Sequence, residues 1–258
     1  MKVPGAGGSW ARWLAVYGWA LLVAVALAGA GYAAEPTGAP AIPAGPPDPA
    51  AALARPGAVA PPTVETLADG SVRLGGITVD SRARSVSFPA TLNAGLTDVI
   101  LEVIIATPRG RLHEALLCAD ISPLTLQSCL YLLQLNNGPR LTDSTGRRGD
   151  LLDIDIEYTA ADGKAVREPV ESWIRDTRTG KPLQRIGWVF TGTTMRDGVF
   201  LAEEEGNICI NFSVGSTILD SSDPQALDDT LHIIESSRTE PPRGAGVRVI
   251  FTARGKAP

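Results

Sequence analysis

The most continuous apolar pattern outside the first 62 residues runs from residue 99 to residue 135. It opens with Val-Ile-Leu-Glu-Val-Ile-Ile-Ala at residues 99–106, which is too uniformly apolar for a strand with one wet face and predicts a central strand covered on both faces. Pro108 and Gly110 then favour a tight turn, because proline fixes φ and glycine tolerates a positive φ. The chain is predicted to reverse there into a strand at residues 112–118, so that the two strands form a hairpin.

The pattern then becomes helical. Ser122 followed by Pro123 is typical of a helix start, because the serine hydroxyl accepts from an unpaired backbone amide and proline has no amide to leave unpaired. Leucines recur afterwards at spacings of three and four residues, and Asn-Asn-Gly-Pro at residues 136–139 ends the pattern. We expect one helix over about residues 122–136, buried against a sheet and covered on most sides. Such a helix would leave no interior room for a reaction centre.

Alternating apolar and polar positions predict short strands on both sides of this stretch. These strands are expected at residues 72–74, 77–79, 86–88, 152–158, 165–170, 186–191, 199–202, 207–212, 231–234 and 247–252. Many strands at short intervals with one convincing helix predict an α+β fold, a single mainly antiparallel β domain with one well-defined buried helix at about 122–136.

The N-terminus has the features of a targeting segment. Lys2 and Arg12 precede an uncharged, mostly apolar run at residues 14–34 that ends in small residues, as a secretory signal does. Residues 1–34 are therefore interpreted as a signal peptide, with cleavage near Ala30 or shortly after it. The alternative is an uncleaved membrane anchor, because residues 14–34 are long enough to cross a bilayer. Both interpretations place the rest of the protein in the periplasm or outside the cell.

A linker is predicted to follow. Nine of the 20 prolines lie between residues 35 and 62, among alanine and glycine and few charges. Such a composition buries too little apolar surface to fold, so residues 35–68 are predicted to be a disordered Pro/Ala-rich linker. The folded domain is expected to span residues 69–256.

The charge of the chain limits the classes of partner that it is expected to bind. The net charge is −5 for the whole chain and −7 without residues 1–34, which carry two cations and no acid. No basic cluster is larger than Arg147-Arg148, so nucleic-acid binding has little electrostatic support. The expected partner is an unidentified protein or envelope component, with membrane contact only through residues 14–34 if these remain attached.

The three cysteines are an odd number for an oxidising compartment. Cys118 and Cys129 are the candidate disulfide, because a helix that folds back on the preceding strand would bring them together. The alternative is that both, together with Cys209, are small buried apolar residues.

Several motifs resemble one family. They are Val-Ser-Phe-Pro-Ala at 86–90 with Asn93, Gly-Arg-Leu-His-Glu-Ala-Leu-Leu at 110–117, Trp-Val-Phe-Thr-Gly-Thr at 188–193 and Pro-Pro-Arg-Gly-Ala-Gly-Val-Arg-Val at 241–249. In this order they resemble the YdjY-domain family of exported bacterial proteins, over about residues 76–254. The family has no established activity, so the resemblance implies no catalytic residues. Its His-Glu pair matches His113 and Glu114, and Arg111 stands where the family commonly has lysine.

The family is sometimes described as ferredoxin-like, but no Cys-x-x-Cys run is present to hold an iron–sulfur cluster. Gly-x-Ser-x-Gly and a phosphate-binding glycine loop are also missing. No cofactor is therefore expected. Trp173 and Trp188 could line a ligand groove, although aromatic residues in strands usually belong to the core.

His113 and Glu114 are the sharpest polar pair and the weak catalytic candidates. In a strand, adjacent side chains point to opposite faces, so the two would not act on one atom. His113 could be a base with a partner from another strand, or a buried histidine hydrogen-bonded to a carbonyl or carboxylate. The second interpretation is preferred.

Asp153, Asp155 and Glu157 are the weak metal candidates, because they alternate along one face of a predicted strand and could collect oxygen ligands for Ca²⁺. Their spacing is not that of a dedicated calcium loop, so solvated charge is the preferred interpretation. Glu203-Glu204-Glu205 is a second acidic stretch of the same kind. A zinc site would have to draw its four ligands from Cys118, Cys129, Cys209, His113 and His232, but no pair of them has the close spacing of known structural zinc sites.

These observations favour an exported, non-catalytic domain that binds a partner or belongs to an envelope assembly, and they make enzymatic activity uncertain. The alternatives are a metal-dependent protein or enzyme that uses His113 with neighbouring acids, and a redox accessory protein that would need an exposed Cys209 with a lowered pKa.

Overall fold

The computed structural model describes residues 62–96, 100–141, 148–185 and 187–255, which belong to one compact unit. The predicted signal or anchor segment and most of the predicted linker lie outside the described residues. Within the described ranges, no helix is long and apolar enough to span a membrane.

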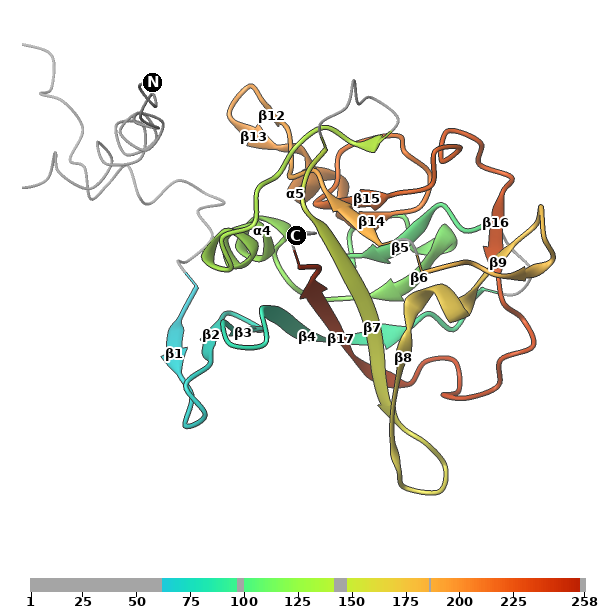
Figure 1. The fold of residues 1–258 in the computed structure, drawn as a ribbon, viewed down its shortest axis with the longest axis horizontal. Coiled ribbons are helices and arrows are strands. Elements are labelled where there is room, and N and C mark those ends of the chain that lie inside the picture. Colours follow the sequence, from blue (N-terminus) through green and yellow to red (C-terminus); the bar gives the residue numbers. More distant parts are fainter. Residues whose placement is uncertain (1–61, 97–99, 142–147, 186, 256–258) are drawn as a thin grey trace, which may run out of the picture. The chain divides into compact units, whose positions relative to one another are not determined.

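Eight strands close into a mixed barrel (Figure 1). In order around it they are β4 (Ser85–Leu92), β17 (Gly246–Ala253), β7 (Leu151–Thr159), β11 (Trp188–Phe190), β15 (Leu219–Ser221), β14 (Asn207–Ile210), β5 (Val103–Ala106) and β6 (Ala115–Cys118). The circle closes because β6 pairs back with β4 at Thr91 and Leu92. Two neighbouring pairs are parallel, β14 with β15 and β5 with β6, and the others are antiparallel.

Other strands extend or flank the barrel. Beyond β4 the sheet continues through β3 (Ile77–Asp80), β2 (Val72–Leu74) and β1 (Val64–Thr66), and β8 (Ala165–Pro169) lies beside β7. A second sheet is formed by β10 (Lys181–Pro182), β9 (Ile174–Asp176) and β16 (His232–Ile234), and β12 (Met195–Arg196) pairs with β13 (Val199–Phe200). The helical segments are η2 (Leu112–Glu114), α4 (Pro123–Leu132), η4 (Val170–Trp173) and α5 (Leu201–Glu205).

With 39% strand and 12% helix, the protein is mainly β, so the predicted α+β class overstated the helical share. The single well-defined helix is nevertheless present as α4, which is the one helix of at least seven residues in the described part of the chain. The prediction of mainly antiparallel strands missed the closure into a barrel, because closure depends on β4 pairing with β6 through a contact that no local pattern records.

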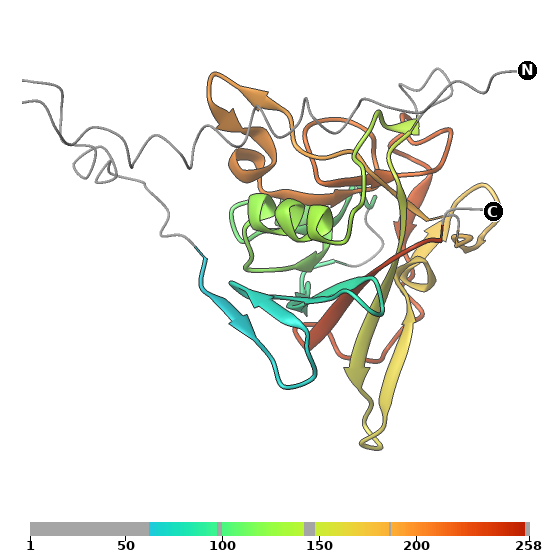
Figure 2. The same ribbon diagram turned by 60° about the vertical axis from the view of Figure 1, so that its left-hand side comes forward.

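Helix α4 begins as predicted. The Ser122 hydroxyl accepts from the Thr125 amide at 3.2 Å, and Pro123 is the first helical residue. The helix packs between β3 and α5 (Figure 2). From α5, the Glu203 carboxylate accepts hydrogen bonds from the Leu124 amide and the Ser122 hydroxyl. Glu203 therefore caps the N-terminus of α4. Its carboxylate is not the solvated charge that the sequence predicted.

The helix is less covered than expected. Leu126 and Leu130 are fully buried, whereas the neighbouring Tyr131 and Leu132 are 45% and 58% exposed. The tyrosine ring still packs against Phe190 at a centroid distance of 5.5 Å. One face of the helix thus joins the core and another faces solvent.

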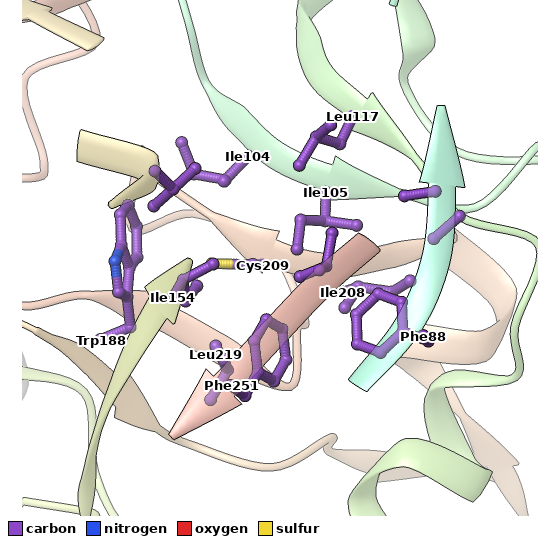
Figure 3. Packing of buried hydrophobic residues seen from close by; sticks show 14 of the residues in the cluster. Phe88, Ile104, Ile105, Leu117, Ile154, Trp188, Ile208, Cys209, Leu219 and Phe251 are labelled. Atoms are coloured by element: carbon purple, nitrogen blue, oxygen red, sulfur yellow. The ribbon is translucent and has the colours of Figure 1, made fainter. Parts of the chain in front are cut away.

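The interior of the barrel is filled by large apolar side chains that point toward one another (Figure 3). Phe88 and Phe251 pack edge to face with ring centroids 5.2 Å apart, and Ile105, Trp188 and Leu219 belong to the same cluster with at most 2% exposure. An eight-stranded barrel is just wide enough for side chains to fill it. The interior is therefore a packed core.

The predicted hairpin at residues 99–118 is wrong. β5 and β6 pair in parallel, and η2 lies in the connection between them. Two contacts direct the connection away from a simple reversal. Thr107 donates its amide to the carbonyl of Gly206, and Gly110 lies so close to Gly206 that a Cβ on it would be 2.6 Å from the same oxygen.

Regular structure begins inside the segment that was predicted to be linker. β1 (Val64–Thr66) pairs with β2 inside the segment predicted as linker at residues 35–68. The regular structure therefore starts at least five residues before the predicted start of the domain.

Candidate functional site

The predicted catalytic pair lies on a short 3-10 helix rather than in a strand. His113 and Glu114 belong to η2, which the Asn93 side chain holds by donating to the carbonyls of Leu112 and Ala115. The His113 side chain is 79% exposed, and its Nε2 atom lies 3.8 Å from Glu114 Oε2. Both the expected burial of His113 and the expected opposite orientation of the two side chains are wrong, because helical turns do not alternate as strands do.

Glu114 is paired more closely with Arg111 than with the histidine. Arg111 Nη1 lies 2.5 Å from Glu114 Oε1 and 2.9 Å from Glu102 Oε2. Burial raises the pKa of Glu114, and the adjacent guanidinium opposes that rise. The arginine thus pairs with both carboxylates, and His113 remains exposed to solvent. This arrangement is typical of a structural ion-pair cluster.

The predicted metal candidates alternate as expected but are paired with arginines. Asp153 and Glu157 are partly exposed, while Asp155 is only 6% exposed, so the predicted wet face is partly covered. The cations are Arg185 and Arg254 at Asp153, Arg167 and Arg185 at Asp155, and Arg248 at Glu157. No group of three or more metal-binding side chains that could hold an ion occurs among the described residues.

All three cysteines are free thiols, so the predicted Cys118–Cys129 disulfide is not formed in this structure. Cys209 is fully buried in the barrel, and burial raises its pKa far above the usual thiol value. Burial likewise raises the pKa of Cys129 to about 11. These environments suppress thiolate formation, which is the opposite of what a redox site needs.

The two tryptophans belong to the core. Trp173 and Trp188 are 0% and 2% exposed. The Trp188 indole donates to Glu171 Oε1 at 3.0 Å, and the Trp173 indole donates to Glu168 Oε1 at 3.1 Å. They do not line a ligand groove.

A different polar cluster is built on the second sheet, whose strands β9 and β16 are labelled in Figure 1. Its centre is Arg178, which donates Nε and Nη2 to the two oxygens of Asp176, each at 2.9 Å. Nη2 also donates to Asp223, and Nη1 donates to Gln225 Oε1. These bonds hold the pKa values of Asp176 and Asp223 below the usual carboxyl range, although burial opposes the effect.

His232 lies behind this cluster. It is 3% exposed, and its register partner in the sheet is Asp176. Its Nε2 atom has no hydrogen-bond partner in the described part of the protein and lies 3.6 Å from Asp223 Oδ2. Burial lowers the pKa of His232, while Asp223 opposes the shift. The imidazole is therefore neutral near pH 7.

A pocket of about 330 Å³ opens in front of the cluster. It is lined by Asp176, Arg178, Thr179, Lys181, Pro182, Leu183, Gln184 and Asp223. Another depression of about 330 Å³ lies over β4, β7 and β17, but its charged residues, Glu157 and Arg248, approach each other to 3.6 Å. Of these two depressions, the one beside Arg178 has a charged wall in which several hydrogen bonds join the groups. We call it the Arg178 pocket.

Sequence reasoning missed this site. The sequence at residues 178–181 predicted only a turn, and His232 was considered only as one of several possible zinc ligands. The Asp-x-Arg spacing of Asp176 and Arg178 was a local signal, but Asp223 lies 45 residues beyond the arginine, and no periodicity links the two.

Comparisons of the chain with protein-family models, with curated proteins and with solved structures returned no match.

Proposed function

We propose that this protein is an exported, non-catalytic binding module whose barrel is a scaffold and whose Arg178 pocket is the binding site. The N-terminal segment targets it to the periplasm or the exterior, as a cleaved signal or as an anchor at residues 14–34. The resemblance to the YdjY-domain family of exported bacterial proteins supports the same location. The partner is then an envelope component or a small molecule found in that compartment.

The observation that carries the proposal is the rigid charged wall of the Arg178 pocket. Asp176 and Asp223 are 12% and 5% exposed at their side chains, and the guanidinium of Arg178 bonds to both. A wall that keeps its shape without ligand reduces the entropy cost of binding. By contrast, the filled barrel leaves no interior space for a ligand, so binding has to take place on the outside.

An enzymatic role through His113 is less well supported. A general base needs a substrate-accessible position next to a group that orients it. His113 is exposed, but its nearest carboxylate, Glu114, is already paired with Arg111. The observation that would favour this role is loss of an activity in His113→Ala with an unchanged fold.

The test is a binding map on the full ¹⁵N-labelled chain. A mixture of small neutral, anionic and cationic sugars and amino acids is added, and backbone amide shifts are followed. We expect shifts at residues 176–184 and 223–225 and none around Glu102 and Glu114. Shifts confined to the Glu102–Glu114 cluster, or no shifts with any compound, would contradict the proposal.

Export is tested separately by fractionating bacterial cells that produce the full chain or a chain lacking residues 1–34. The full chain is expected outside the cytoplasm, and the shortened chain inside it. Recovery of the full chain in the cytoplasm would contradict the exported location.

A further inference from the structure

The polar groups that line the Arg178 pocket differ in whether their hydrogen-bond donors and acceptors already have partners within the protein. Arg178 donates from Nε, Nη1 and Nη2, and every one of these atoms has a carboxylate or amide oxygen as acceptor. Asp176 Oδ1 accepts from both the backbone amide and Nε of Arg178, and Asp223 Oδ1 accepts from the Gln225 amide. These three residues form the wall and have little left to offer a ligand.

Lys181 is the opposite case. It lies in β10, its side chain lines the pocket, and it forms no ion pair with any residue that the structure describes. Gln184, also at the pocket, makes no side-chain hydrogen bond within the described ranges. An ammonium group and an amide are thus free to bind, next to the apolar surfaces of Pro182 and Leu183.

We infer that the Arg178 pocket takes a small hydroxylated carboxylate, whose carboxylate group binds the ammonium of Lys181. This inference rests on the proposed function of the same pocket and adds the class of ligand. The ligand hydroxyls find the amide of Gln184, because the hydroxyl of Thr179 already accepts from the Lys181 amide and donates to the Asp176 carbonyl. A pocket of about 330 Å³ is at the small end of ligand sites, which suits a single sugar acid better than a longer chain.

A cationic ligand fits this pocket poorly. Among the described residues, the carboxylates of Asp176 and Asp223 are the only acids that line it, and their oxygens already accept hydrogen bonds from Arg178. A ligand ammonium would have to compete with that guanidinium and lie near the like charge of Lys181. Lys181 is exposed and, within the described ranges, has no ion-pair partner, so the pocket selects for negative charge.

The experiment compares three probes of the same ring size and different charge: glucuronate, glucose and glucosamine. Each is titrated into the full chain, and affinity is taken from the backbone amide shifts of residues 179–184. Glucuronate is expected to bind best, by about tenfold over glucose, the ratio that corresponds to about 1.4 kcal/mol. Glucosamine is expected to bind worst, and glucuronate binding is expected to weaken as salt is raised.

Two variants test whether Lys181 supplies the positive charge that binds the ligand carboxylate. Lys181→Ala should reduce the glucuronate affinity to that of glucose, while glucose binding stays the same. The matched control is Lys164→Ala, which removes another exposed lysine, one that pairs with Asp162 at 2.5 Å on the loop after β7. That variant should bind like the parent chain, and unfolding curves of both variants show whether they remain folded.

The outcomes separate the inference from the proposed function. Equal binding of the three sugars at the pocket, or unchanged glucuronate binding in Lys181→Ala, would overturn the carboxylate inference and leave the pocket as the binding site. No shift at residues 179–184 with any probe would overturn both.

Discussion

The barrel interior and the two carboxylates in the wall of the Arg178 pocket are both buried, but the two regions are built in different ways. The interior is made of apolar side chains such as Phe88, Phe251 and Leu219, at most 1% exposed. The wall is made of charged groups, Asp176 and Asp223, which are bound through one guanidinium. Apolar packing is not directional and tolerates many partners, whereas a buried charge needs a specific partner at a specific angle.

The difference separates stability from function. The interior excludes water and fixes the positions of the strands, so it supplies most of the folding free energy. The wall gives little net stability for its size, because burial of charge costs nearly as much as the pairing returns. What the wall provides instead is a fixed arrangement of charge beside a pocket. Four predictions test this division, from the largest expected effect to the smallest.

The largest effect is expected in the interior. Phe251→Ala removes a fully buried ring and its edge-to-face contact with Phe88. We expect the free energy of unfolding to fall by about 3–5 kcal/mol, from lost burial and the cavity left behind. Urea unfolding of the full chain measures the change. The control Leu227→Ala, at a leucine that is 60% exposed, should stay within about 0.5 kcal/mol of the parent. A loss below about 1 kcal/mol for Phe251→Ala would show that the interior is loosely packed.

An intermediate effect is expected at the wall. Asp223→Asn keeps the size of the side chain but removes the charge that faces Arg178, which retains Asp176. Hydrogen bonds to charged groups contribute about 1.5–3 kcal/mol, so the unfolding free energy should fall by about that amount. The comparison variant is Asp162→Asn, at an exposed ion pair, for which a clearly smaller loss is expected because solvent screens the pair. Equal effects of the two variants would contradict the special status of the wall.

A smaller effect on stability is expected when the pH is lowered. Because the pKa of His232 lies below its ordinary value of 6.5 in the folded protein, protonation favours the unfolded chain. The stability from the neutral imidazole is complete above pH 6.5 and is lost as the pH falls below it. Asp176, Asp223 and Asp228, which face the histidine together with Arg178, have lowered pKa values and contribute a loss only below their ordinary value of 3.8.

The measurement is the unfolding free energy of the parent chain and of His232→Gln between pH 7 and pH 4. Subtracting the two curves removes groups of the opposite sign, such as Glu114 and Glu171, whose pKa values are raised by burial. The parent should lose more stability than the variant over this range. Parallel curves would show that His232 is not buried as a neutral group.

The smallest expected effect is that of metal ions. Asp153, Asp155 and Glu157 are each paired with arginine, so a cation would have to displace guanidinium groups that already neutralise them. Elemental analysis of the purified protein should find no stoichiometric metal, and a chelator should not change the melting temperature. Stoichiometric calcium or zinc would contradict this reading and would favour the metal-dependent alternative.

The same two regions show how far the sequence predicts the structure. Local patterns predicted the start of α4 at Ser122 and Pro123 and the buried strand β5, because caps and continuous apolar runs act through near neighbours. The alternation in β7 also predicted which residues enter the core. What the pattern does not contain is the partner of each strand, and therefore the parallel pairing of β5 with β6 and the closed barrel were missed.

The polar sites were missed for the same reason. Glu203 caps a helix 79 residues before it, and Asp223 binds an arginine 45 residues before it. His113, predicted to be buried because its neighbours are apolar, is instead exposed because η2 replaces the expected strand. Polar function depends on contacts between distant segments, and such contacts have no local signature.

The central claim is that the barrel interior is filled and closed, so that binding takes place outside it. The most direct test is maleimide labelling of the native full chain, with the modified cysteines identified by mass spectrometry. Cys118, which is partly exposed, should react, whereas Cys129 and Cys209 are buried and should react only after unfolding. Native labelling of Cys209 at a rate similar to that of Cys118 would reveal an accessible cavity inside the barrel and would contradict the account.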